Sequence, residues 1–356
     1  MVTTDGRSRR PTQSDIARLA GVSRTAVSLV LSGNTSKIAL SDDTHAKVES
    51  AARQLGYVRD PVATKLAAGR NNLLGIYTFS SIFPTEIGNS YYGFLTGIEE
   101  ESAEIGYDVV LFTASSTPSF DRSAGELRRV RLADGVILLG RHLPAAEVSE
   151  LLDDDFPLVY IGRQDALGSR LPYVGIDYET ASRDVVDRLI EFGHRRLLYL
   201  REDDDAPSST DRQEGFLRGV GGGLHRGVRG HVLRTAGTTR VTADSLRSWL
   251  TQGFTAIVIE QEGANQALVQ LTDAMDVLGL SAPEDLSIAV LGDPTGLPAG
   301  QPEFAGFAYP REEAGRLAVR LLRRLLAGED VPSAERQALV PCVPITGTTA
   351  GPLAVR

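Results

Sequence analysis

The hydrophobic pattern near the amino terminus predicts two short helices joined by a tight turn. Apolar side chains recur there at three- and four-residue spacing, the period of one buried helix face: Ile16, Ala17, Leu19, Ala20, Ala26, Val27, Val30 and Leu31. Thr12, with Asp15 three residues later, predicts the start of the first helix, because its hydroxyl can accept a free amide of the first turn. Gly21 supplies the backbone freedom for a sharp turn, and Ser23 can cap the second helix. The pattern fits a helix-turn-helix unit and also a helical hairpin inside another kind of domain.

The second helix is predicted to expose the residues that its buried side does not use. They are Arg24, Thr25, Ser28 and Leu29. In a helix-turn-helix unit this face enters the major groove of DNA. A third helix is expected between its cap, Ser41, and Gly56, in the usual position for a helix end. Its expected core residues are Ala46, Val48, Ala51, Ala52 and Leu55.

From Leu73 onward, short apolar runs alternate with amphipathic helical segments, which predicts parallel βαβ units. We expect a first series of strands at residues 73–79, 108–112, 135–139 and 158–161, and a second at 174–176, 197–200, 231–234, 256–259 and 287–291. The expected helices include 91–105, 121–131, 179–192, 210–220, 243–252, 263–278 and 311–326. The glycine-rich residues 219–230 are expected to form a loop. Two such series predict two doubly wound lobes with a ligand cleft between them.

Composition narrows the class of protein. The 356 residues are 42% hydrophobic and 23% charged, which is enough for two or three domains. No eighteen-residue apolar run and no secretory h-region is present, so we expect a cytoplasmic protein that does not enter a membrane. Cys342 is the only cysteine and the five histidines lack metal-ligand spacing, so we expect no disulfide, metal or cofactor.

The charge is distributed unevenly along the chain. Residues 1–70 contain 11 Lys and Arg against 6 Asp and Glu, a net charge of +5, whereas the remainder contains 26 against 40, a net charge of −14. A positive head on an acidic body fits a protein that neutralises DNA phosphates with one domain only. The arginines of the first ten residues, Arg7, Arg9 and Arg10, could equally belong to a solvated tail.

Motifs spread over nearly the whole chain carry a family resemblance. They are the two-helix unit of residues 12–33, the third helix ending at Gly56-Tyr57, the segment 61–70, Leu73-Leu74-Gly75-Ile76, Gly97-Ile98-Glu99 with Gly106-Tyr107, Gly193-His194, residues 212–216, and residues 277–280 with 283–287. The headpiece and the segment after it are highly specific, whereas the later motifs are strong mainly through their order. Together they resemble the lactose/galactose repressor (LacI-type) family of transcriptional regulators.

The resemblance implies an α/β fold with an N-terminal three-helix helix-turn-helix headpiece (1–60), a hinge helix (61–70), a two-lobed periplasmic-binding-protein-like core with two doubly wound parallel sheets (71–346), and a tail (347–356). We place the N-lobe at about 71–173 and 304–331, and the C-lobe at about 174–303 and 332–346. A homodimer on a near-palindromic operator in double-stranded DNA is implied, with a small-molecule effector, a sugar or related metabolite, between the lobes. Such a protein would associate with the nucleoid when bound to DNA.

The resemblance also places nine residues on DNA: Thr12, Ser23, Arg24, Thr25, Ser28, Leu29, Asn34, Tyr57 and Leu66. Arg24, Thr25 and Leu29 fall on base-reading positions. Many relatives carry arginine at the position of Leu29, so a leucine removes a bidentate guanine contact and can touch a thymine methyl instead. Leu66 matches a leucine that relatives insert into the minor groove, which suits a short helix that folds only with a partner. Alternatively, Leu66 packs only on its dimer mate.

Six residues are implied in the effector pocket: Ser80, Tyr91, Arg163, Arg212, Gln261 and Asp293. Arg212 matches an arginine that clamps the ligand in relatives, and its five fixed donors suit hydroxyls or carboxylates. Two acids that several relatives use are missing, because Gly162 and Gly292 stand at their positions. The ligand is therefore expected to be less hydroxylated or more acidic than a typical hexose.

An enzyme is the competing class of protein, and the sequence does not favour it. There is no Gly-x-Ser-x-Gly elbow, phosphate loop or His-Glu-x-x-His helix, and His194 is better explained as a structural residue at a helix end than as a general base. A second alternative is a DNA-binding regulator that responds to a protein partner and has no small-molecule effector. An inducer and a corepressor remain equally compatible with the sequence.

Overall fold

We describe the protein from a computed structural model. The structure describes residues 11–32, 40–57, 71–79, 91–113, 127–235, 241–261, 265–293, 297 and 300–353. The chain divides into two compact units, Met1–Asn72, which we call the headpiece, and Leu73–Arg356, which we call the core. The expected hinge helix at 61–70 lies outside the described residues.

The headpiece contains three helices, α1 (Gln13–Ala20), α2 (Arg24–Ser32) and α3 (Asp42–Gln54), as predicted. The Thr12 hydroxyl accepts the Asp15 amide at 3.4 Å, and the Asp15 carboxylate accepts the Thr12 amide at 3.0 Å, which forms a capping box. Gly21 ends α1 with a φ of +65°, which favours glycine. Among the described residues, six buried side chains form the apolar cluster of the headpiece: Ile16, Val27, Val30, Val48, Ala51 and Ala52.

Two expected headpiece core residues are instead exposed. Leu19 in α1 is 47% exposed, and Ala46 in α3 is also exposed. Both have the right helical spacing, but α1 is covered on the side of Ile16, Ala17 and Ala20, and α3 on the side of Val48 and its neighbours. A three-helix unit this small covers only a narrow stripe of each helix, which periodicity alone overestimates.

The core alternates strands with helices. Its strands are β1 (Leu73–Thr78), β2 (Asp108–Thr113), β3 (Gly135–Leu139), β4 (Leu158–Ile161), β5 (Tyr173–Asp177), β6 (Arg196–Glu202), β7 (Arg229–Thr235), β8 (Ala256–Glu260), β9 (Ser287–Leu291), β10 (Ala305–Ala308), β11 (Gln337–Pro341) and β12 (Val343–Ile345). Its α-helices are α5 (Tyr92–Glu104), α6 (Ala145–Asp153), α7 (Tyr178–Glu191), α8 (Pro207–Gly222), α9 (Ala243–Thr251), α10 (Gln266–Leu278), α11 (Arg311–Leu326) and α12 (Ser333–Arg336), and its 3₁₀ turns are η1 (Leu127–Leu132), η2 (Gly168–Arg170) and η3 (Leu224–Arg226).

The first lobe is built on a parallel sheet with the strand order β11-β5-β4-β3-β1-β2. Alternate strand residues point to opposite faces, because the side-chain period of a strand is two. Ile137 and Val159 pack on one face with α5 and α11, and Leu138 and Leu158 pack on the other with η1 and α6. Both faces are therefore covered, which is why these strands read as continuous apolar runs.

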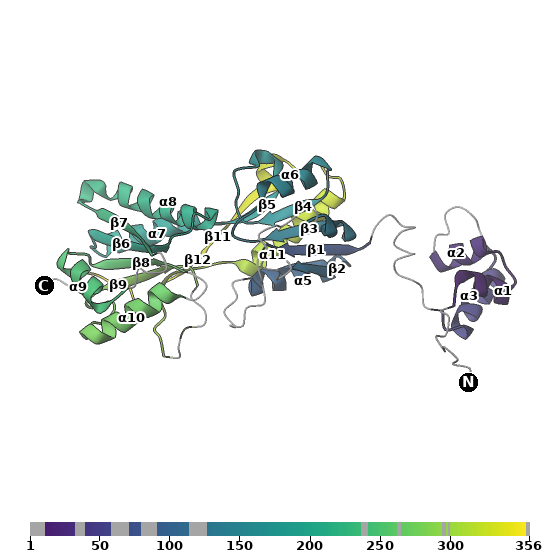
Figure 1. The fold of residues 1–356 in the computed structure, drawn as a ribbon, viewed down its shortest axis with the longest axis horizontal. Coiled ribbons are helices and arrows are strands. Elements are labelled where there is room, and N and C mark those ends of the chain that lie inside the picture. Colours follow the sequence, from purple (N-terminus) through teal and green to yellow (C-terminus); the bar gives the residue numbers. More distant parts are fainter. Residues whose placement is uncertain are drawn as a thin grey trace, which may run out of the picture. The chain divides into compact units, whose positions relative to one another are not determined.

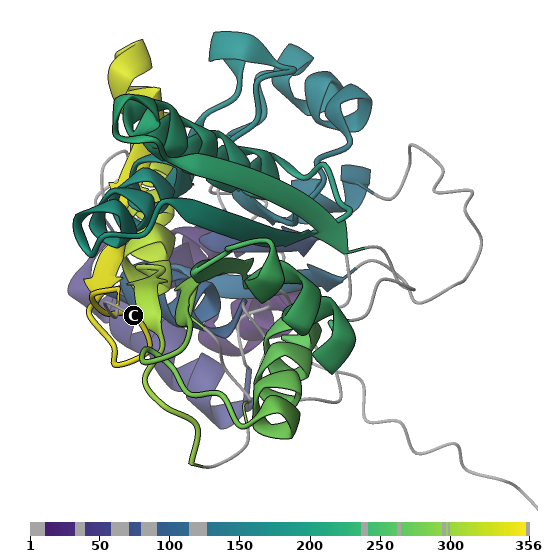
Figure 2. The same cartoon turned by 90° about the vertical axis from the view of Figure 1, so that its left-hand side faces the viewer.

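The second lobe repeats this design with the order β12-β10-β9-β8-β6-β7, in which β12 is antiparallel to β10. Leu197 and Val258 pack against α7 and α8, whereas Leu198 and Ile257 pack against α9 and α10. In Figure 2 the teal helices α7 and α8 and the green helices α9 and α10 lie on opposite faces of this sheet. In both sheets the order in which the chain adds parallel strands reverses at equivalent places, between β1 and β3 and between β6 and β8.

The chain crosses between the lobes three times, and the crossings correct the lobe bounds expected from the sequence. They follow β5, β10 and β11, so β5 and β11 belong to the first sheet, and β10 and β12 belong to the second. We had expected residues 174–176 and 337–341 in the C-lobe and residues 305–308 in the N-lobe. Strand pairing assigns β5 to the first sheet, because Ile161 of β4 lies beside Val174 of β5. Figure 1 shows β11 and β12 where the chain passes from the first sheet to the second.

Two further expectations change. Residues 127–132 form a 3₁₀ turn rather than part of a helix over 121–131, and residues 121–126 lie outside the described residues. Residues 219–222 form the end of α8 instead of a loop. A side chain at Gly219 would come within 2.7 Å of Val186, so this glycine lets α8 pack closely on α7. Within the described residues, no helix is both long and apolar enough to span a membrane.

Candidate functional site

The exposed face of α2 is the first candidate site. The Ser23 hydroxyl accepts the Ala26 amide at 3.1 Å and fixes the start of the helix. Ala26, Val27 and Val30 are buried, which leaves Arg24, Thr25 and Ser28 exposed and Leu29 partly exposed, as predicted. This face carries a guanidinium, two hydroxyls and an apolar group, the kinds of group that read base edges and phosphates in DNA.

The other headpiece residues predicted to contact DNA have mixed placements. Thr12 and Ser23 are partly committed to the caps of α1 and α2. Tyr57 packs partly on the headpiece core. Asn34 and Leu66 lie outside the described residues.

The second candidate site is a cavity of about 130 Å³ between the lobes. Its walls come from the carboxyl ends of strands in both sheets and from the helices that follow them, the place where doubly wound sheets bind ligands. Four predicted residues line it: Tyr91, Arg163, Arg212 and Gln261. Asp293 does not line the cavity, but its carboxylate pairs with the lining residue Arg311 at 3.3 Å. Ser80 lies outside the described residues.

Arg212 is the anchor of the pocket on the second lobe. It is 4% exposed, and it donates to the carbonyls of Leu291 at 3.0 Å and Ser208 at 2.9 Å and to the Tyr309 hydroxyl at 2.5 Å. Its guanidinium carbon lies 3.9 Å from the centre of the Tyr178 ring, a cation–π contact. Because Tyr178 and Tyr309 follow the first two chain crossings, Arg212 braces the connection between the lobes.

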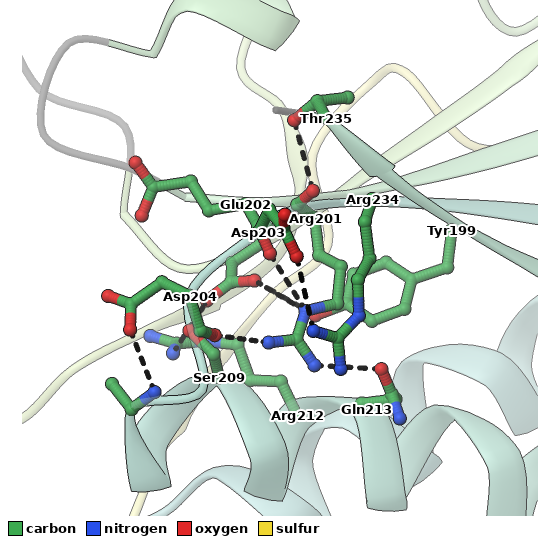
Figure 3. A network of polar contacts seen from close by, with 12 residues as sticks. Tyr199, Arg201, Glu202, Asp203, Asp204, Ser209, Arg212, Gln213, Arg234 and Thr235 are labelled. Atoms are coloured by element: carbon green, nitrogen blue, oxygen red, sulfur yellow. Dashed lines mark hydrogen bonds and ion pairs between the residues drawn. The ribbon is translucent and has the colours of Figure 1, made fainter. Parts of the chain in front are cut away.

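A buried polar network stands behind Arg212 (Figure 3). Glu260 at the end of β8 lies 3.6 Å from Arg212 and 3.8 Å from Arg201, and all three side chains are at most 5% exposed. The Ser209 hydroxyl donates to Glu260, and Arg201 donates to Gln213 at 2.7 Å. Buried charges are stable only when they are paired and hydrogen-bonded, so this network fixes Arg212 rather than offering it freely to solvent.

Charged pairs also join the lobes across the mouth of the pocket. Arg163 of the first lobe donates to Asp211 of α8 at 2.5 and 3.1 Å. Arg141, which follows β3, lies 2.7 Å from Asp204 and 3.2 Å from Glu202 of the second lobe. These contacts hold the two lobes together in the described arrangement.

Tyrosine rings occupy the space beside the two glycines that replace acids of relatives. A side chain at Gly162 would lie 2.7 Å from the Tyr160 ring, and one at Gly292 would lie 2.2 Å from the Tyr309 hydroxyl. Both glycines also have positive φ values, +137° and +148°. Burial raises the pKa of the phenols of Tyr160 and Tyr309, so both remain neutral. The pocket therefore has tyrosine rings beside Gly162 and Gly292, the two positions at which the sequence predicted that carboxylates are missing.

Several lining residues were not predicted, among them Arg141, Tyr160, Tyr178, Asp211, Tyr309 and Arg311. Arg141 lies just after a strand that was predicted, so the rule that ligands bind at strand carboxyl ends would have indicated it. Tyr309 and Arg311 follow β10, which was not predicted, and no sequence signal pointed to them.

His194 has the structural role that the sequence favoured. It is 2% exposed, and its ring nitrogens lie 2.9 Å from the Thr255 hydroxyl, 3.0 Å from the Ser287 hydroxyl and 3.1 Å from the Gly351 carbonyl. Burial lowers the pKa of this imidazole. The histidine therefore ties the carboxyl-terminal segment to the second lobe.

A larger cavity, of about 280 Å³, lies within the second lobe between α7 and strands β10 and β12. Its lining is mostly apolar and includes Phe192, Phe307 and Cys342. Burial raises the pKa of the Cys342 thiol to about 12, so it is protonated and unreactive at neutral pH.

Comparison with known protein families gives one match in the headpiece and one in the core. Residues 12–60 match the family of bacterial regulatory proteins of the lacI type, and residues 186–349 match the periplasmic binding protein-like domain. The chain therefore carries a LacI-family DNA-binding domain together with a periplasmic-binding-protein-like domain. It is a DNA-binding transcriptional regulator, as the sequence predicted, with two parallel-sheet lobes following its headpiece.

Individual relatives of this chain extend over nearly its whole length. The HTH-type transcriptional regulator CelR of Thermobifida fusca is 28% identical over 91% of the chain and 94% of its own length. The HTH-type transcriptional repressor CytR of Escherichia coli is 28% identical over 91% of the chain and 92% of its own length. These relatives are named as regulators and not as enzymes.

Solved structures agree with the fold. A CelR–cellobiose complex is 25% identical with a TM-score of 0.62, covering 96% of this chain and all of its own. The lac repressor dimer bound to operator and an anti-inducer has a TM-score of 0.72 at 22% identity, covering 97% of this chain and all of its own. The second likeness concerns the fold alone.

Proposed function

We propose that this protein is a LacI-family repressor whose operator affinity is switched by a small molecule bound between the lobes. The observation that carries the proposal is the placement of Arg212, which lines the interlobe pocket and contacts residues at two of the chain crossings. A ligand at Arg212 is therefore in a position to favour one lobe arrangement over another. Differential affinity for two arrangements is what a ligand needs to shift an equilibrium.

The headpiece supplies the DNA contacts in this proposal. Arg24, Thr25 and Leu29 read base edges from α2, and Ser23, Ser28 and Tyr57 hold phosphates. The family resemblance adds Asn34 and Leu66 to the residues that contact DNA. An arginine aimed at guanine discriminates by about 1–3 kcal/mol, whereas phosphate contacts position the protein without specifying sequence.

The protein acts as a homodimer on a near-palindromic operator. Two large apolar residues are 75% exposed, Tyr92 on α5 and Val277 on α10. These helices belong to different lobes, and both lie along the lower side of the core in Figure 1. Each of these side chains is suited to contact with a second copy of the chain, because large exposed apolar groups are typical of association surfaces.

The effector is a metabolite of sugar-like size. CelR, the relative solved with cellobiose, is similar over nearly the whole chain. In the present pocket, arginines lie directly beside aromatic rings, with Arg212 over Tyr178 and Arg311 over Tyr309, which suits a ring with polar substituents.

Selection of the full chain against random DNA duplexes tests the proposed function first. The expected product is a two-fold-related site, bound with an affinity that falls steeply as salt rises. A gel shift with that site is then repeated with candidate metabolites that stabilise the protein in thermal unfolding. Recovery of no preferred sequence would refute the DNA-reading roles. A ligand that binds in the pocket and leaves operator affinity unchanged would refute the switch.

A further inference from the structure

The interlobe pocket contains far more hydrogen-bond donors than free acceptors. Four arginines line it, Arg141, Arg163, Arg212 and Arg311, and among the described lining residues Asp211 is the only carboxylate. Both oxygens of Asp211 accept hydrogen bonds from Arg163. A ligand whose polar groups are mainly donors would find few partners here.

The amide oxygen of Gln261 is also in use, because it accepts the Tyr309 hydroxyl at 2.9 Å. The carbonyl of Gly140 accepts the Tyr160 hydroxyl at 2.7 Å. Gly162 and Gly292 contribute no side chain, and the tyrosine rings beside them leave no room for one. Among the described lining residues, the acceptors that would receive the hydroxyls of a neutral sugar are therefore scarce.

Arg311 is the least neutralised of the four arginines. Its side chain is 11% exposed and stacks on the Tyr309 ring, with the guanidinium carbon 4.4 Å from the ring centre. Of its five N–H donors, one forms a hydrogen bond, to Asp293 at 3.3 Å, and its Nε is buried without an acceptor among the described residues. A buried guanidinium with so few acceptors is stabilised strongly by a negative charge placed beside it.

Arg141 offers a second set of donors. Its Nη2 reaches Ser209, Glu202 and Asp204, and its Nη1 has no hydrogen bond to any residue that the structure describes. Glu202 and Asp204 are 34% and 26% exposed, so solvent weakens their hold on the Arg141 charge. Arg163 and Arg212, by contrast, are held by buried partners.

The size of the pocket limits the ligand. The cavity of about 130 Å³ is close to the roughly 150 Å³ of a cavity that holds one benzene ring. Phe94, Tyr91, Tyr160 and Tyr178 supply apolar and aromatic surface around it. A single ring fits this space, and a disaccharide does not fit it in the described lobe arrangement.

We propose that the effector is a one-ring organic anion, a carboxylate or a phosphate ester, whose anionic oxygens bind Arg311 and Arg141. Its ring lies among the tyrosines of the pocket. This inference rests on the proposed function, since it names the ligand class of the same site.

The test compares matched anionic and neutral probes on the full-length protein at constant ionic strength. The pairs are glucuronate against glucose, glucose 6-phosphate against glucose, and benzoate against benzamide. Thermal unfolding and equilibrium titration are expected to show binding of at least one anion, at least about tenfold tighter than its neutral counterpart. The carboxylate and phosphate members distinguish the two sources of negative charge.

Variants locate the charge. Arg311→Gln is expected to weaken the bound anion by about tenfold or more, whereas Arg170→Gln, at an exposed arginine outside the pocket, leaves its affinity unchanged. Circular dichroism checks that both variants fold. Equal binding of the neutral probes, failure of every anion to bind, or full affinity in Arg311→Gln would each overturn the inference.

The same measurements separate this inference from the proposed function. A neutral ligand that binds in the pocket and changes operator affinity would refute the anion class and support the switch. An anion that needs Arg311 but leaves operator affinity unchanged would support the ligand class and refute the switch.

Discussion

Arg163 of the first lobe and Asp211 of the second are joined by two hydrogen bonds, Nη2 to Oδ1 at 2.5 Å and Nε to Oδ2 at 3.1 Å. The Asp211 side chain is 7% exposed, and that of Arg163 is 30% exposed. The pair therefore sits at the edge of the pocket, where it spans the two lobes and borders the ligand. Any ligand that enters must coexist with this pair or replace one of its partners.

Asp211→Asn is expected to lower the free energy of unfolding by about 1–3 kcal/mol, because it leaves Arg163 without its buried counter-charge. Urea unfolding followed by circular dichroism measures the change. Asp153→Asn is the matched control, since it breaks the exposed Arg170–Asp153 pair within one lobe and is expected to cost less than about 1 kcal/mol. Equal losses in the two variants would show that the pair between the lobes contributes no more to the free energy of unfolding than the exposed pair within one lobe.

Tyr178→Leu is expected to destabilise the core by about 1–2 kcal/mol, because it removes the ring on which Arg212 stacks. Tyr178→Phe keeps the ring and is the control, and it should remain near wild-type stability. The same urea titration compares them. If the phenylalanine variant loses as much as the leucine variant, the hydroxyl rather than the ring is the important group.

His194 predicts a pH dependence of stability. Burial lowers its pKa, so below about pH 6.5 the unfolded chain binds a proton that the folded chain does not, and stability falls as the pH falls. His194→Gln is expected to remove this component and to cost about 1–3 kcal/mol at neutral pH through the lost hydrogen bonds.

Thermal unfolding between pH 5 and pH 8 measures the histidine effect, with the exposed His225→Gln as control. The control is expected to keep the wild-type pH profile. A His194→Gln profile parallel to that of the wild type would exclude His194 as the source of the pH dependence.

Leu29→Arg is expected to change the preferred base at one position in each operator half-site toward guanine, because arginine can bond both guanine acceptors in the major groove. Selection from random duplexes measures the preference. Leu19→Arg adds the same charge on the exposed side of α1 and should leave the preferred sequence unchanged. The same shift in both variants would mean that charge alone, and not the position of residue 29, causes it.

Local chemistry explains which parts of the fold could be predicted. The caps at Thr12, Ser23 and Ser41 and the strand 135–139 follow from patterns within a few residues, and all appear in the structure. The short strands β10 and β12 were missed, because β10 consists of Ala, Gly, Phe and Ala and β12 has only three residues, one of them proline. Their pairing, and hence the lobe bounds, depends on contacts between distant segments, which a local pattern cannot encode.

In the candidate site, too, the sequence could predict some residues and not others. Arg212 could be placed in the pocket from the family resemblance, because it sits in the motif of residues 212–216, and Arg163 was placed there because it follows Gly162. Arg311 and Tyr309 could not, since they follow β10. Glu260, which holds Arg212 in place, ends an apolar strand and gave no signal of its own.

In the proposed function, ligand binding between the lobes and operator binding by the headpiece are coupled. Linkage requires this coupling to be reciprocal. The decisive measurement is the affinity of the full-length protein for its ligand, by calorimetric titration, in the absence and in the presence of saturating operator duplex. We expect operator to change ligand affinity by the same factor by which the ligand changes operator affinity, about fivefold or more. Equal ligand affinity with and without operator would contradict this coupling.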